Sequence, residues 1–89
     1  MKSGRLVRAL AGHAGCVHAV AGLPGRLLAS GSEDETVRLW EIGSGRLVRT
    51  LAGHTGSVNA LAMLLGGLLA SGSDDNTVVV WRGADSFGQ

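Results

Sequence analysis

The most constraining feature of this sequence is that it repeats itself. Shifting the chain by 41 residues aligns residues 3–40 with residues 44–81, and 26 of these 38 positions are identical. The longest shared stretch reads LLASGSEDETVRLW at 27–40 and LLASGSDDNTVVVW at 68–81. A period of this length corresponds to one structural unit of a repeat architecture. Two such units occupy nearly all of the 89 residues, so the fold must be built from them.

Each copy of the repeat divides into short apolar runs separated by residues typical of turns. The runs are bounded by glycine and show no apolar spacing of i, i+3, i+4, which favours strands over helices. TVVVW and LLAS are apolar without alternation, which indicates a sheet covered on both faces. The expected strands are residues 5–10, 16–21, 26–32 and 36–42, and their counterparts 46–51, 57–62, 67–73 and 77–82.

Composition excludes several classes of protein. A net charge of +1 gives no electrostatic case for nucleic acid or an anionic membrane. The apolar stretch 60–70 is too short and too interrupted by glycine to span a bilayer. Cys16 is the only cysteine, so no intrachain disulfide is possible, and no Cys/His cluster has zinc spacing. With no apolar signal segment at the start, we expect a cytoplasmic protein without metal or cofactor.

The repeated residues resemble the WD-repeat β-propeller family. The resemblance rests on Gly12-His13 and Gly53-His54, followed by SGSEDETVRLW and SGSDDNTVVVW. The dipeptide that names the family is replaced by Trp-Glu at 40–41 and Trp-Arg at 81–82. The resemblance implies an all-β fold of two four-stranded antiparallel blades, the second lacking its own outer strand and the pair incomplete alone. The expected divisions are a first repeat at 3–43, a second at 44–83 and a polar tail at 84–89.

The resemblance also implies a buried hydrogen-bonded tetrad in each blade, made of a loop His, a strand Ser, a turn Asp and the Trp indole. Ser32 and Ser73 are alternatives for the serine, two residues further along the same strand face. We expect a structural role rather than a catalytic one, because the serine is on no exposed elbow and the same set occurs in both copies. The implied tetrads are His13, Ser30, Asp34 and Trp40, and His54, Ser71, Asp75 and Trp81.

The function implied by the resemblance is a non-catalytic scaffold for protein–protein interaction, part of a larger or self-assembled propeller. Two alternatives stay open: a structural unit, natural or designed, without activity of its own, and an oligomeric propeller that binds a small ligand. Acidic loops suggest a basic partner, although such charges also serve solubility. The implied contact residues are Ala14, His18, Glu33 and Glu35 in the first copy, and Thr55, Asn59, Asp74 and Asn76 in the second.

Strand order predicts how the blades are completed. In the family each repeat starts with the outer strand of the preceding blade, so residues 46–51 complete the blade made by 16–42. Nothing after Trp81 completes the second blade. We therefore expect residues 5–10 of one copy to pair with 77–82 of another. Three or four copies would then form a ring of six or eight blades, within the range of about four to eight known for propellers. Further blades of a longer chain are the alternative.

Overall fold

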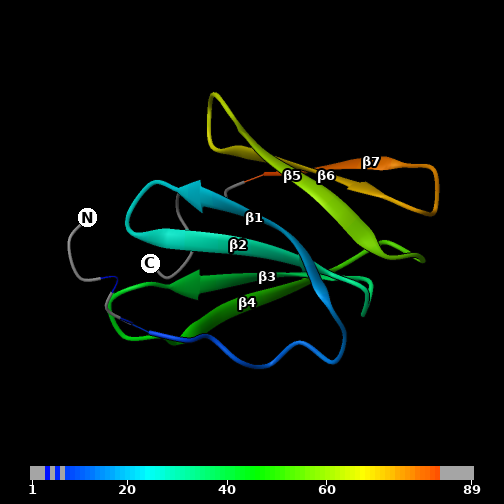
Figure 1. Ribbon diagram of the computed structural model, residues 1–89. Helices are drawn as coiled ribbons and strands as arrows, with labels where there is room; N and C mark the ends of the chain where they lie inside the picture. The colour runs from blue at the N-terminus through cyan, green and yellow to red at the C-terminus, as the bar shows by residue number, and fades with distance from the viewer. Residues whose placement is uncertain (1–3, 5, 7, 83–89) are drawn as a thin grey trace.

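The protein folds into two antiparallel sheets, drawn one above the other in Figure 1. The computed structural model describes residues 4, 6 and 8–82. None of these residues forms a helix, so none of the described elements is a helix that could cross a membrane. The first sheet has the strand order β1-β2-β3-β4 and the second β5-β6-β7. The strands are β1 Val17–Leu23, β2 Leu27–Ser32, β3 Thr36–Glu41, β4 Leu47–Ala52, β5 Val58–Leu64, β6 Leu68–Ser73 and β7 Val78–Trp81.

The boundaries of the sheets do not coincide with those of the repeats. Strand β4 follows the start of the second repeat, yet it pairs with β3 through Thr36↔Ala52 and Val37↔Leu51. Among the described residues no strand pairs with the outer edge of β7. The expected fold class is therefore confirmed, including the missing outer strand of the second blade. The expected runs agree with the seven strands to within two residues at each end.

The described residues before β1 are not part of either sheet. Residues 8–10 form no strand in the single chain, and residues 5 and 7 of the expected strand 5–10 lie outside the described residues. The guanidinium of Arg8 donates hydrogen bonds to the carbonyl oxygens of Gly43 and Ser44, at 2.9 and 3.2 Å, in the turn between β3 and β4. The expected pairing of 5–10 with a neighbouring copy therefore stays a prediction, and the expected tail 84–89 also lies outside the described residues.

The two turns that join the first and second strand of each sheet share one backbone shape. Gly25 and Arg26 have φ angles of 77° and 63°, and Gly66 and Gly67 have 80° and 74°. Two successive left-handed residues suit glycine, whereas a residue with a Cβ pays a steric cost there. Arg26 therefore carries strain that its counterpart Gly67 avoids.

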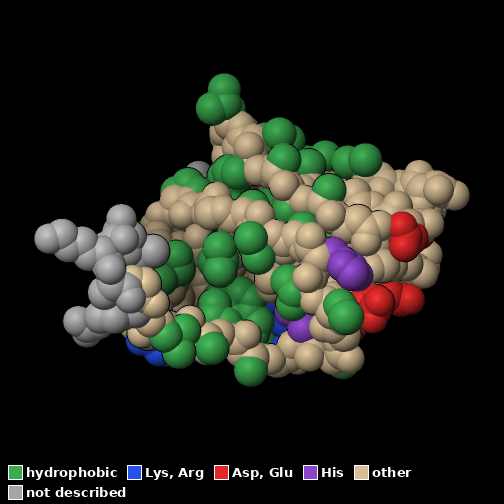
Figure 2. Space-filling model, viewed as in Figure 1, with side chains coloured by type: hydrophobic (Ala, Val, Ile, Leu, Met, Phe, Trp, Pro, Cys, Tyr) green, Lys and Arg blue, Asp and Glu red, His purple; other side chains and the backbone are tan. Residues whose placement is uncertain are grey.

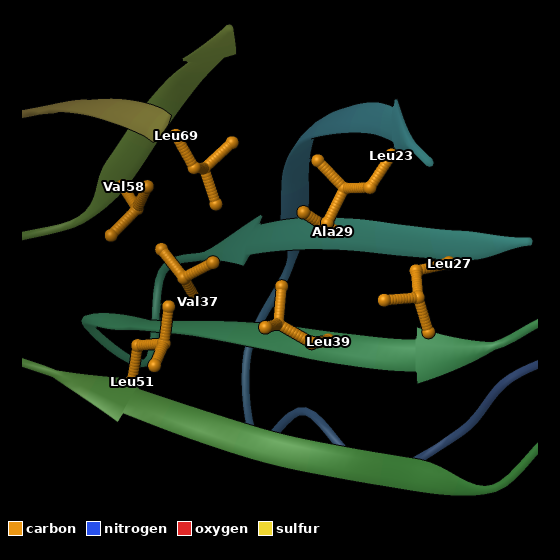
Figure 3. Close-up of a cluster of buried hydrophobic side chains, with 8 residues drawn as sticks. All are labelled: Leu23, Leu27, Ala29, Val37, Leu39, Leu51, Val58 and Leu69. Atoms are coloured by element: carbon orange, nitrogen blue, oxygen red, sulfur yellow. The ribbon is translucent and has the colours of Figure 1, made fainter. Parts of the chain in front are cut away.

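The hydrophobic core lies between the two sheets. One face of the first sheet contributes Ala29, Val37 and Leu39, all fully buried. Val58 from β5 and Leu69 from β6 face them from the second sheet, as Figure 3 shows. The contact is so close that a Cβ added to Gly31 of β2 would lie 2.6 Å from Cγ1 of Val58. The two sheets therefore pack face to face through apolar side chains.

Candidate functional site

A chain of hydrogen bonds runs through the first sheet from Trp40 to Asp34. The indole nitrogen of Trp40 donates to Ser30 Oγ at 2.8 Å. Ser30 Oγ lies 2.6 Å from Nε2 of His13, whose Nδ1 lies 2.9 Å from Oδ2 of Asp34. The backbone N–H of Ala14 donates to the same carboxylate oxygen at 3.0 Å. Four residues from a loop, two strands and a turn are thus joined in one network.

The network assigns the protons without ambiguity when the histidine is neutral. An ionised Asp34 only accepts, so Nδ1 of His13 carries the hydrogen and Nε2 accepts. The hydroxyl of Ser30 then donates to Nε2 and accepts from the indole N–H of Trp40. Every hydrogen bond in this series is therefore donated in the same direction, from Trp40 toward Asp34. In such an arrangement each hydrogen bond polarises the next.

The second sheet contains the same network at residues 41 positions later. Trp81 Nε1 donates to Ser71 Oγ at 2.9 Å, and Ser71 Oγ lies 2.7 Å from Nε2 of His54. Nδ1 of His54 lies 2.9 Å from Oδ2 of Asp75. The loop residue Thr55 donates its N–H to that oxygen, as Ala14 does in the first sheet.

The alternative serines make a different contact. Ser32 Oγ accepts from the backbone N–H of Asp34, and Ser73 Oγ accepts from that of Asp75, each at 3.0 Å. Ser32 and Ser73 therefore hold the turn in shape, while Ser30 and Ser71 bond to the Trp and His side chains.

The turn threonines are members of the network that the sequence reasoning missed. The hydroxyl and the N–H of Thr36 both donate to Oδ1 of Asp34, at 2.6 and 3.0 Å. Thr77 makes the same pair of bonds to Asp75, at 2.5 and 2.9 Å. The signal was present in the sequence, since both copies read Asp-x-Thr.

These donors set the charge state of the two aspartates. Burial raises the pKa of Asp34, but hydrogen bonds from the Thr36 hydroxyl, His13 and backbone N–H groups outweigh it, so the net pKa lies well below its ordinary value. The pKa of Asp75 is also well below its ordinary value, chiefly through the hydroxyl of Thr77 and the N–H of Thr55. Both carboxyls are therefore ionised at neutral pH.

The order Ser30–His13–Asp34 repeats the order of a hydrolase triad, yet its surroundings differ. Ser30 and Ser71 are buried, and each Oγ already accepts a tryptophan N–H. A nucleophilic serine instead needs access to substrate and a nearby pair of oxyanion donors. Among the described residues no three His, Cys, Asp or Glu side chains are grouped as metal ligands would be. Fixing a loop and a turn to the sheet is what this geometry achieves.

The eight expected contact residues lie at one end of the two sheets. In Figure 2 the acidic and histidine side chains visible on this side gather at the end where Figure 1 draws the β2–β3 and β6–β7 turns. We call this set the loop face. It consists of Ala14, His18, Glu33 and Glu35, and of Thr55, Asn59, Asp74 and Asn76, and all eight are exposed.

Two further contacts organise the loop face. His18 and Asn59 occupy β-bulges at the start of β1 and β5, where an extra residue re-aims its side chain. Nε2 of His18 lies 3.8 Å from Oε2 of Glu33, and the amide of Asn59 donates to Asp74 Oδ1. Position 18 and position 59 therefore differ in side chain but each meets the acidic residue at the corresponding turn.

Two shallow apolar cavities lie on the outer faces of the sheets. The larger, of about 250 Å³, lies on the first sheet and is lined chiefly by Leu10, Val17, Leu28 and Trp40. The smaller, of about 200 Å³, lies over Ala60, Ala70, Gly72 and Val78 on the second sheet. The polar residues of the larger lining are Arg8, His13 and Ser30, and Ser71 is the polar residue of the smaller one.

Comparisons with known proteins agree with this architecture. The family described as WD domain, G-beta repeat, matches residues 4–41 and again residues 45–82. A comparison with curated proteins gave no match. Among solved structures 394 chains match, and one is the crystal structure of the computationally designed Ika4 protein. It is similar to this chain with a TM-score of 0.76 and 32% identity over 94% of this chain. The chain spans about half, 52%, of the length of that designed protein.

Proposed function

The chain belongs to the WD-repeat family, and from this we propose that it is a non-catalytic scaffold for protein–protein interaction, acting within a larger or self-assembled propeller. Proteins of this family are typically scaffolds without catalytic activity. The fold alone does not establish the function of one chain, so the proposal rests on the surface that the fold presents. We also propose that the protein is cytoplasmic. Its one cysteine, Cys16, has an exposed free thiol, which is consistent with a reducing compartment.

The observation that carries the proposal is the duplicated and rigidly held loop face. Each network joins a loop N–H and a turn carboxylate to the strands beneath, through His13 and Asp34 in one sheet and His54 and Asp75 in the other. Binding residues are often carried on loops positioned by such a scaffold. We propose that the tetrads have this structural role and that the loop face is the contact surface.

Charge indicates the chemistry of the partner. The exposed side chains of Glu33, Glu35 and Asp74 give the loop face a negative potential, and complementary potentials guide association and specificity. We therefore propose a basic protein segment as the partner.

A pair of matched variants tests this proposal. Glu33→Gln/Asp74→Asn removes one negative charge from the loop face of each sheet. Pro24→Lys/Leu65→Lys makes the same change in net charge at the exposed turns at the opposite end of the strands. The probe is a fluorescein-labelled decalysine peptide, with binding followed by anisotropy at low and physiological salt. We expect the first pair to weaken binding several-fold and the second to leave it nearly unchanged. Equal weakening by both pairs, or no binding by the unaltered protein, would contradict the proposal.

Completion of the propeller is the second part of the proposal. A sheet with an unpaired strand edge and open apolar faces is incomplete as a repeat structure. We propose that residues 5–10 of a neighbouring copy, or a further blade, pair with β7 (Val78–Trp81). Deletion of residues 2–10 should then reduce the assembly measured by native mass spectrometry, and Val7→Pro should do so if the N–H of Val7 takes part in the ladder. An assembly of unchanged mass after the deletion would contradict this pairing.

A further inference from the structure

The contact between the two sheets supplies a pattern that recurs on their outer faces. At this internal junction Val58 of β5 is fully buried against Gly31 of β2. The residue 41 positions before Val58 is Val17, and the residue 41 positions after Gly31 is Gly72. Both therefore lie at the corresponding places on the outer faces, Val17 on the first sheet and Gly72 on the second.

We call the outer face of the second sheet the back face. Its side chains correspond to those of the first sheet that are buried at the internal junction. Val37 and Leu39 are fully buried there, whereas their counterparts Val78 and Val80 are 72% and 55% exposed. Over Gly72 there is open space, since an added Cβ would meet only the Cβ of Ala60, at 3.8 Å. The back face comprises Ala60, Ala62, Ala70, Gly72, Val78 and Val80.

We call the outer face of the first sheet the front face. Val17 and Val20 are 51% and 62% exposed, although the counterpart of Val17, Val58, is fully buried. Leu28 and Trp40 complete the face, and Leu10 of the preceding segment lies beside them around the larger cavity. The counterpart of Leu10 is Leu51, which packs in the core at the internal junction. The front face therefore presents most of the apolar pattern that the second sheet presents inward, with Gly22 in place of Met63 and Arg38 in place of Val79.

From this we propose that copies of the chain bind front face to back face, with Val17 of one copy seated over Gly72 of the next. The side chains of Val78 and Val80 would fill the cavity beside Leu10, as Val37 and Leu39 fill the internal junction. This inference rests on the proposal that the blades act in a completed propeller. The interface is head-to-tail, so it closes into a ring when the rotation between copies allows.

The two junctions differ at a few positions, and these predict their relative strength. At the internal junction the second sheet contributes Leu61, and the first contributes Leu39. At the junction between copies the corresponding residues are Val20 and Val80, each one methylene smaller, and Gly22 replaces Met63, which packs against the internal core. Less apolar volume is buried there, so the junction between copies is the weaker one and the ring dissociates on dilution.

The first experiment blocks each face separately. Gly72→Leu fills the space on the back face, and Val17→Asp/Val20→Asp places charges on the front face. All three positions face open space in the single chain, so circular dichroism should show folded protein. By native mass spectrometry each variant should be monomeric at a concentration where the unaltered chain assembles. When the two variants are mixed one to one, they should form a species of two chains and no larger one. The intact front face of Gly72→Leu binds the intact back face of Val17→Asp/Val20→Asp, and the two blocked faces bind nothing further.

The second experiment strengthens the interface. Val20→Leu/Val80→Leu copies the internal junction at these two positions and should lower the midpoint concentration of dissociation about tenfold, from two added buried methylenes. Pro24→Lys/Leu65→Lys, at the exposed turn ends, is the control and should leave the midpoint unchanged. A monomeric unaltered chain, assembly by Gly72→Leu alone, or a mixture without the two-chain species would overturn the proposal. Binding of the decalysine peptide is read in the same samples. Assembly without peptide binding contradicts the proposed partner alone. Peptide binding by a permanent monomer contradicts this inference and the proposed pairing of residues 5–10 between copies, and leaves the proposed partner standing.

Discussion

The indole N–H of Trp40 donates to the hydroxyl oxygen of Ser30 at 2.8 Å, and both side chains are buried. A buried indole N–H that loses its acceptor cannot be hydrated instead. Ser30→Ala should therefore lower the free energy of unfolding by about 1–3 kcal/mol, measured by urea denaturation. In a Trp40→Phe background, where no N–H is left unpaired, the same change should cost distinctly less. An equal cost in both backgrounds would show that the bond contributes nothing.

His13 and Asp34 should behave as one unit. Replacing either by alanine breaks the same chain of bonds, so His13→Ala and Asp34→Ala should each cost on the order of 1–3 kcal/mol. Their combined cost in the double variant should be smaller than the sum of the two, because the second change removes bonds already lost. Thermal or urea unfolding of the four proteins measures this coupling, and strict additivity would mean that the two residues do not interact.

Acid should weaken the fold through Asp34 and Asp75, whose pKa values both lie below the ordinary range. An unfolded aspartate has a pKa of about 4. The stabilisation is therefore fully present above about pH 4 and is lost as the pH falls from there toward the lower folded-state pKa. Unfolding free energies measured between pH 6 and pH 2 should decline in the acidic part. The double variant Asp34→Asn/Asp75→Asn should show a smaller decline in the free energy of unfolding. A decline as steep as in the unaltered chain would mean that other titratable groups cause it.

No hydrolysis should depend on the Ser–His–Asp sets. Ser30→Ala and His54→Ala should change stability and leave the rate of p-nitrophenyl acetate hydrolysis equal to that of the unaltered protein. The reason is that Ser30 Oγ is buried and already accepts a hydrogen bond from Trp40. A rate that disappears with either change, in protein that circular dichroism shows to be folded, would establish a catalytic role.

A substitution in the turn between β1 and β2 should stabilise the protein. Arg26→Gly removes the Cβ from a residue with a φ of 63°. The second copy has glycine at the corresponding position, Gly67, where φ is 74°. Relief of the left-handed strain exceeds the entropy cost of glycine, so the free energy of unfolding should rise by about 0.5–1 kcal/mol. The reverse change, Gly67→Arg, is the matched control and should lower it. Melting temperatures that move the other way would place the strain elsewhere.

The strands and their order were predictable because the repeat allows each segment to be compared with its copy. An ambiguous apolar stretch at 60–70 is aligned with 19–29, which contains Pro24 and Arg26. The crossing of β4 into the first sheet followed from the family resemblance, and the pairing of Val37 with Leu51 confirms it.

Details that depend on distance across the sheet were not predictable. Ser30 and Ser32 lie on the same strand face, so period-two alternation does not distinguish the one that bonds to Trp40. The two hydrogen bonds from Thr36 to Asp34 depend on the turn geometry at Glu35, which has a φ of 75°. The contact of Arg8 with the carbonyls of Gly43 and Ser44 joins residues 35 and 36 positions apart, which the spacing of the repeat does not indicate.

The offset between the repeat and the sheet has an evolutionary consequence. Because β4 (Leu47–Ala52) starts the second repeat and completes the first sheet, the unit that duplicates is out of phase with the unit that folds. An array of such repeats, whatever their number, begins with a segment that corresponds to β4 and ends with a sheet of three strands. Unequal recombination between the near-identical copies would thus change how many blades a gene encodes. The proposed pairing between the first segment and the last sheet would stay the same. Family members with different blade numbers are then reachable by single genetic events, with no new interface to evolve.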